Sequence, residues 1–325
     1  MTATAKPPSL VPPPALGALG ALGALGALDP DAPPPPRAWL ATAGAVVYVF
    51  VWASAFVPSR IIATSAPPLW VLSARFFCAG ALLLAIARAA HLPWPAGLWS
   101  WGAAAVYGVL ANALYLGLNY EALRHLSSGM GAIIASTNPL LLAVLAPVFL
   151  GEALTARKAI GLALGFVGVL VAMQARAASS TARPADVLVA AGGVLALVFS
   201  TIVFKRTRGG THPLVVNAIS LVAAGLATLP CAAVVEGRPE VAVTPALVVS
   251  FAYLVVVLSI GATLLWFWLL SRGEASRVSA FYFLTPLFGV AAGALLLGER
   301  VFALDGVGLV VVVAGIALAT RKPPG

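Results

Sequence analysis

Two proline-containing pairs offer the clearest binding chemistry in this chain of 325 residues. Asn138-Pro139 and Thr285-Pro286 lie 147 positions apart, near the middle of two long apolar runs. A proline inside a helix removes a backbone hydrogen bond and frees carbonyl groups, which must then face protein or water rather than lipid. The polar side chain before each proline therefore predicts a pair of hydrogen-bonding positions beside two helix kinks, which suits binding rather than catalysis.

Gly151-Glu152 and Gly298-Glu299 repeat the same spacing of 147 residues at the ends of the same runs. Glycine suits the left-handed position that ends a helix, and a carboxylate suits the positive start of the next helix. We interpret both pairs as helix-end devices. A substrate or ion site at the membrane surface is the alternative.

Arg75 is the only charged residue well inside an apolar run. An arginine near the membrane centre costs on the order of 3 kcal/mol on insertion scales, so something is expected to offset that cost. Two interpretations follow: the side chain binds an anionic group, or it extends to the outer headgroups. Its counterpart in the second copy is Val222, so the charge belongs to one copy only.

The composition defines the class of protein that must position these residues. Hydrophobic residues make up 61% of the chain and charged residues 9%, and the mean hydropathy is +1.03, whereas soluble domains carry about a quarter charged residues. The net charge of +9 comes from Lys and Arg placed singly or in small groups between apolar runs. That pattern sets membrane orientation and does not indicate nucleic-acid binding. Metal-ligand, nucleotide-binding and catalytic motifs are missing from the sequence, so we expect no cofactor, no metal and no enzyme activity.

Ten apolar runs follow one another, each long enough to cross a hydrocarbon core about 30 Å thick. An odd number of spans in each copy inverts the second copy relative to the first. The sequence therefore predicts an all-α polytopic membrane protein with ten transmembrane helices as two inverted five-helix repeats, at residues 37–174 and 184–321. The predicted spans are 38–58, 69–88, 98–118, 127–150, 155–173, 186–205, 213–235, 245–270, 276–297 and 301–320.

The flanks of these spans predict the orientation of the chain. Twelve Lys and Arg residues fall on one side and six on the other, which places both termini in the cytoplasm. Residues 1–36 are rich in Pro, Ala, Leu and Gly and are expected to form a disordered cytoplasmic tail. A removed signal or an interfacial segment is the alternative for this stretch.

The motifs taken together resemble the EamA-type repeat of the drug/metabolite transporter superfamily. The resemblance implies a bacterial inner-membrane carrier, usually an exporter of amino acids, metabolites or drugs, with a cavity formed by the first four spans of each half. A basic residue in the second span recurs in such proteins, so the resemblance supports a binding role for Arg75. The matching residues of the first half are 119–123 (Asn-Tyr-Glu-Ala-Leu), Ser127-Ser128, Asn138-Pro139, Gly151-Glu152, Gly161 and Gly168, and those of the second half are Thr285-Pro286, Gly298-Glu299, Gly308 and Gly315.

We therefore expect a secondary transporter, not driven by ATP, that exports a small metabolite such as an amino acid by alternating access. Every acidic residue lies in the tail, in a loop or at a span end, so a mid-membrane proton relay is not expected. The alternatives are a non-transporting membrane scaffold and a membrane-embedded lipid-modifying enzyme. Tyr and Trp present apolar area with one hydrogen-bonding tip, which suits an amphipathic substrate. The predicted substrate contacts are Trp52, Arg75, Tyr115, Asn138, Tyr282 and Thr285.

The predicted partners are the lipid bilayer and the small-molecule substrate. Gly161 and Gly165 share one helix face, as do Gly289 and Gly293, and this spacing permits close helix approach. We expect these faces to pack within the chain. A homodimer formed through spans five and ten is the alternative.

Overall fold

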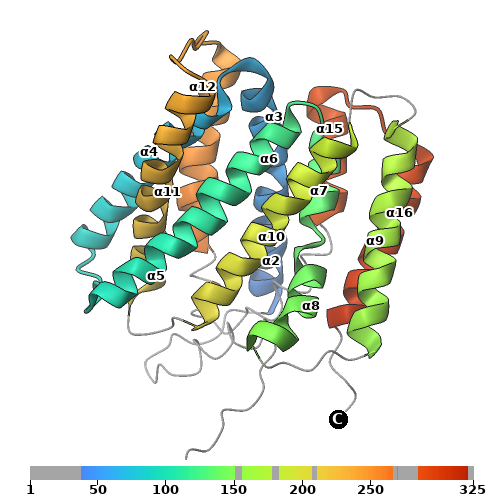
Figure 1. Cartoon of the computed structure of the whole chain (residues 1–325), viewed down its shortest axis with the longest axis horizontal. Coiled ribbons are helices and arrows are strands. Elements are labelled where there is room, and N and C mark those ends of the chain that lie inside the picture. Colours follow the sequence, from blue (N-terminus) through green and yellow to red (C-terminus); the bar gives the residue numbers. More distant parts are fainter. Residues whose placement is uncertain are drawn as a thin grey trace, which may run out of the picture.

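The computed structural model describes residues 38–150, 156–177, 183–206, 211–265, 269 and 285–320, and the elements in these ranges are all helical. Figure 1 shows them as a bundle of rods that run up and down beside one another. Within the described ranges, six helices are long and apolar enough to cross a membrane, and shorter apolar helices accompany them. The prediction of an all-α multi-pass membrane protein is confirmed at this level. The six are Ala43–Ser65, Pro68–Ala89, Leu98–Leu123, Pro184–Phe204, Pro213–Val235 and Pro245–Leu265.

The elements of the two halves follow the same order. In the first half they are α2 (Ala38–Ser54), α3 (Phe56–Ser65), α4 (Pro68–Ala89), α5 (Leu98–Gly108), η1 (Val109–Leu114), α6 (Tyr115–Leu123), α7 (Ser128–Ala135), α8 (Asn138–Leu150) and α9 (Ala156–Ala177). In the second half they are α10 (Pro184–Arg206), α11 (Pro213–Val235), α12 (Pro245–Ala252), η2 (Tyr253–Ala262), α15 (Thr285–Leu297) and α16 (Ala303–Thr320).

Helices α9 and α16, which are counterparts in the repeat, pack against each other through glycines. A Cβ atom added to Gly168 would lie 2.7 Å from the carbonyl oxygen of Gly308, and one added to Gly315 would lie 2.5 Å from that of Gly161. Each contact is the other one shifted by 147 residues, and the pairing order makes the helices antiparallel. The absence of side chains lets the two backbones touch. Gly161 and Gly165 therefore contact α16 within the chain, and Gly289 and Gly293 contact Ala132 and Ser128 of the first half. The homodimer stays an alternative.

Helices α4 and α11 form a second pair of counterparts. Gly80 packs against Val222, and Gly225 packs against the ring of Phe77, so these two helices are antiparallel as well. At one end of the pair, the carboxylate of Glu236 accepts hydrogen bonds from the first backbone N–H groups of α4, which neutralises a helix start. Figure 1 shows the two pairs at opposite edges of the bundle.

The fourth span is broken rather than bent. Helix α7 ends at Ala135 and α8 begins at Asn138, with Ser136 and Thr137 between them. Pro139 is the second residue of α8, where its missing N–H leaves no helical bond unmade. The predicted kink is therefore a complete break, and the proline starts a new half-helix. The described part of helix α15 begins at Thr285, directly before Pro286, and the preceding residues lie outside the described ranges.

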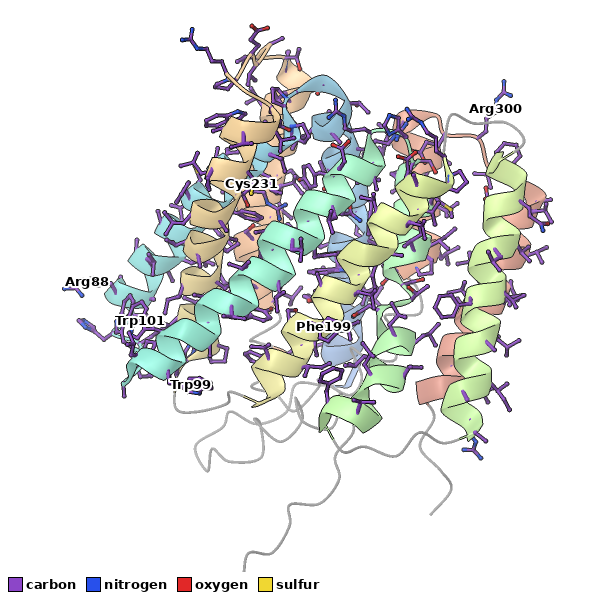
Figure 2. The ribbon with its side chains drawn as sticks, viewed as in Figure 1. Arg88, Trp99, Trp101, Phe199, Cys231 and Arg300 are labelled. Carbon is purple, nitrogen blue, oxygen red and sulfur yellow. The ribbon has the colours of Figure 1, made fainter. Side chains whose placement is uncertain are left out.

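Aromatic and basic side chains mark the ends of the bundle. Figure 2 shows Arg88, Trp99 and Trp101 at one end and Arg300 at the other. Trp99 is 77% exposed and Trp101 is 40% exposed at the start of α5. Tryptophan and arginine at such positions are typical of the boundary between lipid and water. The bundle therefore presents two interfacial ends separated by apolar helices.

Candidate functional site

Helix α4 carries Arg75 into the interior of the bundle, where the residue is only 5% exposed. Its Nη1 donates to the hydroxyl of Tyr120 and its Nη2 to that of Ser259, both at 3.5 Å, the long limit for a hydrogen bond. Nε is buried without a hydrogen-bond partner in the described part of the chain. The alternative in which Arg75 extends to the headgroups does not fit this geometry. The guanidinium group instead lies among neutral hydroxyls.

Four side chains make up a polar centre: Ser59, Arg75, Tyr120 and Ser259. The hydroxyl of Ser59 donates to that of Tyr120 at 3.3 Å, which connects α3 to α6 and through Arg75 to α4 and η2. The centre therefore joins four spans from both halves of the chain. Among these residues the sequence predicted Arg75 alone. Tyr120 lies within the motif that carries the family resemblance, whereas Ser59 and Ser259 stand in apolar runs that gave no signal.

A continuous apolar cluster surrounds the polar centre, and it belongs to the largest group of buried side chains. Tyr120 is itself fully buried there, so its ring contributes apolar area while its hydroxyl bonds to Ser59 and Arg75. A site with a few polar groups inside an apolar lining is typical of small-molecule binding. The buried members of this cluster that lie within a few positions of Ser59, Arg75 or Ser259 in the sequence are Phe56, Leu72, Phe76, Leu254 and Val255.

Two π-helical segments occupy equivalent positions in the two halves. η1 carries Asn112 and η2 carries Ser259, which are 147 positions apart. Asn112 donates to Ser220 of α11 at 3.4 Å, and Ser259 accepts from Arg75 of α4. π-Helical turns are rare and frequently mark functional sites. In each half a polar contact therefore joins the π-helix to the same neighbouring helix, although Ser220 is equivalent to Ser73 rather than to Arg75. Neither contact could be predicted from the sequence, because π-helices leave no residue signature in apolar runs.

Asn138 and Thr285 carry buried side-chain oxygen atoms without hydrogen-bond partners in the described part of the chain. Thr285 is 3% exposed, and its Oγ1 lacks a hydrogen-bond partner among the described residues, as does the buried Oδ1 of Asn138. Leaving a buried polar group unpaired costs about 1–3 kcal/mol. Helix starts also carry positive partial charge. The oxygens of Asn138 and Thr285 can therefore accept hydrogen bonds from a polar ligand, and both residues remain candidate substrate contacts.

The other predicted contacts lie elsewhere. Trp52 is half-buried and stacks on Tyr48 of its own helix, with ring centroids 6.5 Å apart. Tyr115 is 4% exposed and packs with Ala190 and Val194 of α10, in a different cluster from Tyr120. Tyr282 lies outside the described residues. The structure therefore brings Arg75 into the polar centre, while the roles of Trp52, Tyr115 and Tyr282 stay predictions.

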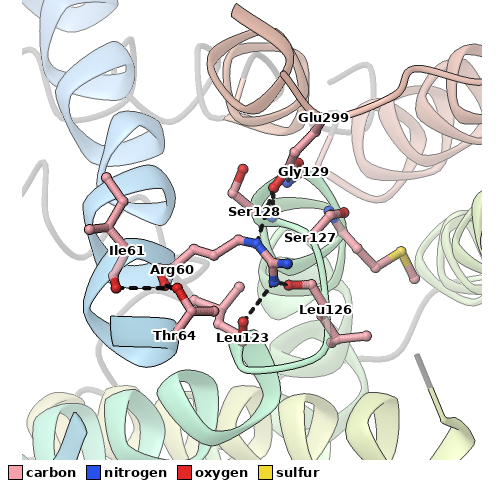
Figure 3. A network of polar contacts seen from close by, with 10 residues as sticks. Arg60, Ile61, Thr64, Leu123, Leu126, Ser127, Ser128, Gly129 and Glu299 are labelled. Atoms are coloured by element: carbon pink, nitrogen blue, oxygen red, sulfur yellow. Dashed lines mark hydrogen bonds and ion pairs between the residues drawn. The ribbon is translucent and has the colours of Figure 1, made fainter. Parts of the chain in front are cut away.

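Glu299 binds the start of a helix in the other half of the chain. Its Oε1 accepts from the backbone N–H of Ser128 at 2.7 Å and its Oε2 from that of Gly129 at 3.2 Å, so it caps α7 (Figure 3). Gly298 has the expected left-handed backbone, with φ of 64°. The predicted target was wrong, however, because the helix that follows is capped by Asp305, which accepts from the N–H of Phe302.

Arg60 completes this arrangement at the same end of the bundle. Its Nε lies 3.5 Å from Oε1 of Glu299, and its Nη1 donates to the carbonyl groups of Leu123 and Leu126 (Figure 3). We refer to Arg60, Ser128, Gly129 and Glu299 as the inter-repeat clamp. It connects α3, the α6–α7 corner and the end of α15. The counterpart pair Gly151-Glu152 lies outside the described residues.

The fold defines a multi-pass helical membrane protein with two matching halves. The EamA-like transporter family matches this chain twice, at residues 39–174 and 185–321, and the chain belongs to that family. The described ranges contain no group of three His, Cys, Asp or Glu side chains that could hold a metal ion.

Several curated proteins are similar along most of the chain. An uncharacterized transporter of Bacillus subtilis, YvbV, is 28% identical over 280 residues, covering 84% of this chain and 89% of that protein. An uncharacterized inner membrane transporter of Escherichia coli, YedA, is 27% identical, covering 87% and 92%. A chloroplastic WAT1-related protein of Arabidopsis thaliana is 26% identical, covering 83% and 66%. A solved crystal structure shares the fold, with a TM-score of 0.55 at 18% identity, and covers 86% of this chain and 95% of that one.

Proposed function

We propose that this protein is a secondary transporter that exports a small organic metabolite across a bacterial cytoplasmic membrane by alternating access. The observation that carries the proposal is the antiparallel, reciprocal packing of α9 against α16. Such reciprocity fits two inverted repeats of five spans each, ten in all, related by an axis in the membrane plane. An inverted pair has two nearly equivalent ways to tilt, which supports alternation between inward-facing and outward-facing states.

The site supports transport better than the two rival functions. A scaffold has no use for buried polar atoms without partners, whereas a transporter needs polar groups that form hydrogen bonds only when a substrate binds. A lipid-modifying enzyme would need a nucleophile, an acid pair or a metal site at one membrane face. The polar centre holds a cation and three hydroxyls, which can bind and orient a molecule.

Counterflow in proteoliposomes tests the role of Asn138 and Thr285 in transport. We expect the double variant Asn138→Leu with Thr285→Val to lose substrate counterflow by about tenfold or more, because it removes the two side-chain oxygens that can accept a hydrogen bond from a substrate. Its melting temperature should stay level or rise, since neither side-chain oxygen is hydrogen-bonded to a described residue. A screen of labelled amino acids and organic acids identifies the substrate to use.

A matched control for this test is Thr64→Val, which removes an exposed hydroxyl that bonds only within its own helix. Its counterflow should equal that of the parent protein. Absence of counterflow for every compound with a folded protein, or full activity in the double variant, would contradict the assignment of these residues and favour the scaffold.

Cysteine labelling tests the proposed orientation, with both termini in the cytoplasm. Cys78 and Cys231 are exposed and must first be replaced by serine. Arg124 and Arg157 are exposed at opposite ends of the fourth span. We expect Arg124→Cys to react with an impermeant maleimide on intact cells, and Arg157→Cys to react only after permeabilisation. The reverse pattern would overturn the orientation.

A further inference from the structure

The charge of Arg75 has no counter-ion in the described part of the chain. Arginine does not lose its proton in proteins, so a cation is buried in the bundle. No carboxylate of the described residues lies within ion-pair distance of Arg75, and each of them is occupied or placed elsewhere. Glu121 pairs with Arg124, Asp186 with His125, Glu299 with Arg60, Glu236 caps α4, Asp305 caps α16, and Glu240 is exposed.

The repeat itself provides an internal comparison. Ser259 of η2 contacts α4 through Arg75, and its counterpart Asn112 of η1 contacts the counterpart helix α11 through Ser220, which is equivalent to Ser73. The residue of α11 equivalent to Arg75 is Val222. That copy joins a π-helix to its neighbour without any charge. The fold therefore does not need a cation to make this contact. The positive charge is an addition to one half, and structure alone does not account for it.

From these observations we infer that the polar centre binds the carboxylate of an organic monoanion through Arg75. Nε and Nη2 lie on one edge of the guanidinium group, and this edge matches the two oxygens of a carboxylate. Nε is free, and Nη2 makes only a long contact to Ser259. A bound carboxylate accepts from both nitrogens, and the Tyr120 hydroxyl, which bonds to Nη1, stays in place beside it.

The surroundings define the rest of the ligand. A single cation is balanced by a single negative charge, so a monoanion fits better than a phosphate dianion. The neighbours of the centre are apolar, including Leu72, Phe76 and Leu254, which suits an apolar body attached to the carboxylate. No described carboxylate stands by to receive an ammonium group. The ligand is therefore a simple organic acid rather than a zwitterionic amino acid.

This inference deepens the proposed transport function and rests on it, but its test measures binding alone. Purified protein in detergent is heated with benzoate, benzamide or benzylamine, which share one ring and differ in charge, at constant ionic strength. We expect benzoate to raise the melting temperature saturably, by about 3 °C, and the other two compounds to have no effect. Hexanoate and hexanamide repeat the comparison without a ring.

Variants assign the effect to the residue. Arg75→Gln should weaken the apparent affinity for benzoate about tenfold or more. Arg75→Lys keeps the charge but loses the paired N–H donors of the guanidinium group, so its affinity should lie between those of the unaltered protein and Arg75→Gln. Asn112→Ala, at the equivalent neutral contact, is the matched control and should leave benzoate binding unchanged. Stabilisation by benzamide or benzylamine equal to that by benzoate, or wild-type affinity in Arg75→Gln, would overturn the inference.

Binding and transport fail in distinguishable ways. Stabilisation by benzoate that depends on Arg75, without counterflow of any carboxylate, would support the anion site and contradict transport. Counterflow of neutral or cationic compounds without stabilisation by carboxylates would support transport and overturn the anion site. The comparison of charged and neutral ligands on the unaltered protein also remains decisive where Arg75→Gln does not fold.

Discussion

Replacing Glu299 by glutamine is expected to open the clamp end of the bundle. The inter-repeat clamp joins α3 and α7 of the first half to the end of α15 in the second, so it must break before these ends can part. Glutamine keeps an acceptor but loses the charge that faces Arg60 and the start of α7. The loss of charge-assisted bonding is about 1.5 kcal/mol, which shifts the ratio of open to closed states about tenfold.

A buried cysteine reports this opening. Ser128 is fully buried at the start of α7, so Ser128→Cys, in a background without Cys78 and Cys231, should react slowly with a maleimide. Adding Glu299→Gln should raise the labelling rate about tenfold. Counterflow should fall, because the closed state at this end becomes harder to reach.

Glu121→Gln provides the control for this prediction. Its carboxylate also pairs with an arginine, Arg124, but both side chains are about half exposed, and surface pairs contribute little. Labelling of Ser128→Cys should not change in this background. Equal labelling in the Glu299 and Glu121 variants would mean that the clamp does not hold the two halves together.

Adding a methyl group to Gly168 is expected to separate α9 from α16. The new Cβ would lie 2.7 Å from the carbonyl oxygen of Gly308, and backbone atoms of a packed helix cannot yield as a side chain can. Overpacking of this kind costs about 1–3 kcal/mol. We expect Gly168→Ala to lower the melting temperature of the purified protein by about 5 °C.

Two further glycine variants test whether the effect comes from this helix contact. Gly315→Ala should have nearly the same effect as Gly168→Ala, because the two positions are counterparts in one reciprocal contact. Gly306 lies on the same helix α16 with nothing near its Cβ position, so Gly306→Ala should raise the melting temperature by about 2 °C. A fall in all three variants would show general sensitivity to alanine rather than a close helix contact.

The order and correspondence of the helices could be predicted because the repeat can be found by comparing positions along the sequence alone. Equal spacing of the glycines and the polar-proline pairs predicted which helices correspond, and α8 does begin at Asn138. The same pattern could not show that Pro139 begins a separate half-helix. That depends on Ser136 and Thr137, whose hydroxyls bond to carbonyl groups of the preceding turn and end α7.

The polar centre was only partly predictable for a related reason. A buried charge stands out in an apolar run, so Arg75 could be identified from sequence. Its partners Tyr120 and Ser259 come from elements 45 and 184 positions away, and only the folded bundle brings them together. Glu299 illustrates the same limit. Its position in the sequence predicted that it caps the helix that follows. In the fold its carboxylate instead binds the start of α7, 171 positions away.

In the proposed alternating-access cycle, the charge of Arg75 makes the two half-cycles electrically unequal. With a monoanion bound, the pair is neutral, and its movement across the membrane is indifferent to voltage. Without ligand, the site carries a positive charge, and an interior-negative potential favours its inward position by about 2.3 kcal/mol per 100 mV for a full crossing. The membrane potential would then return the empty carrier to the cytoplasmic side, so an energised cell would drive export without a coupled ion.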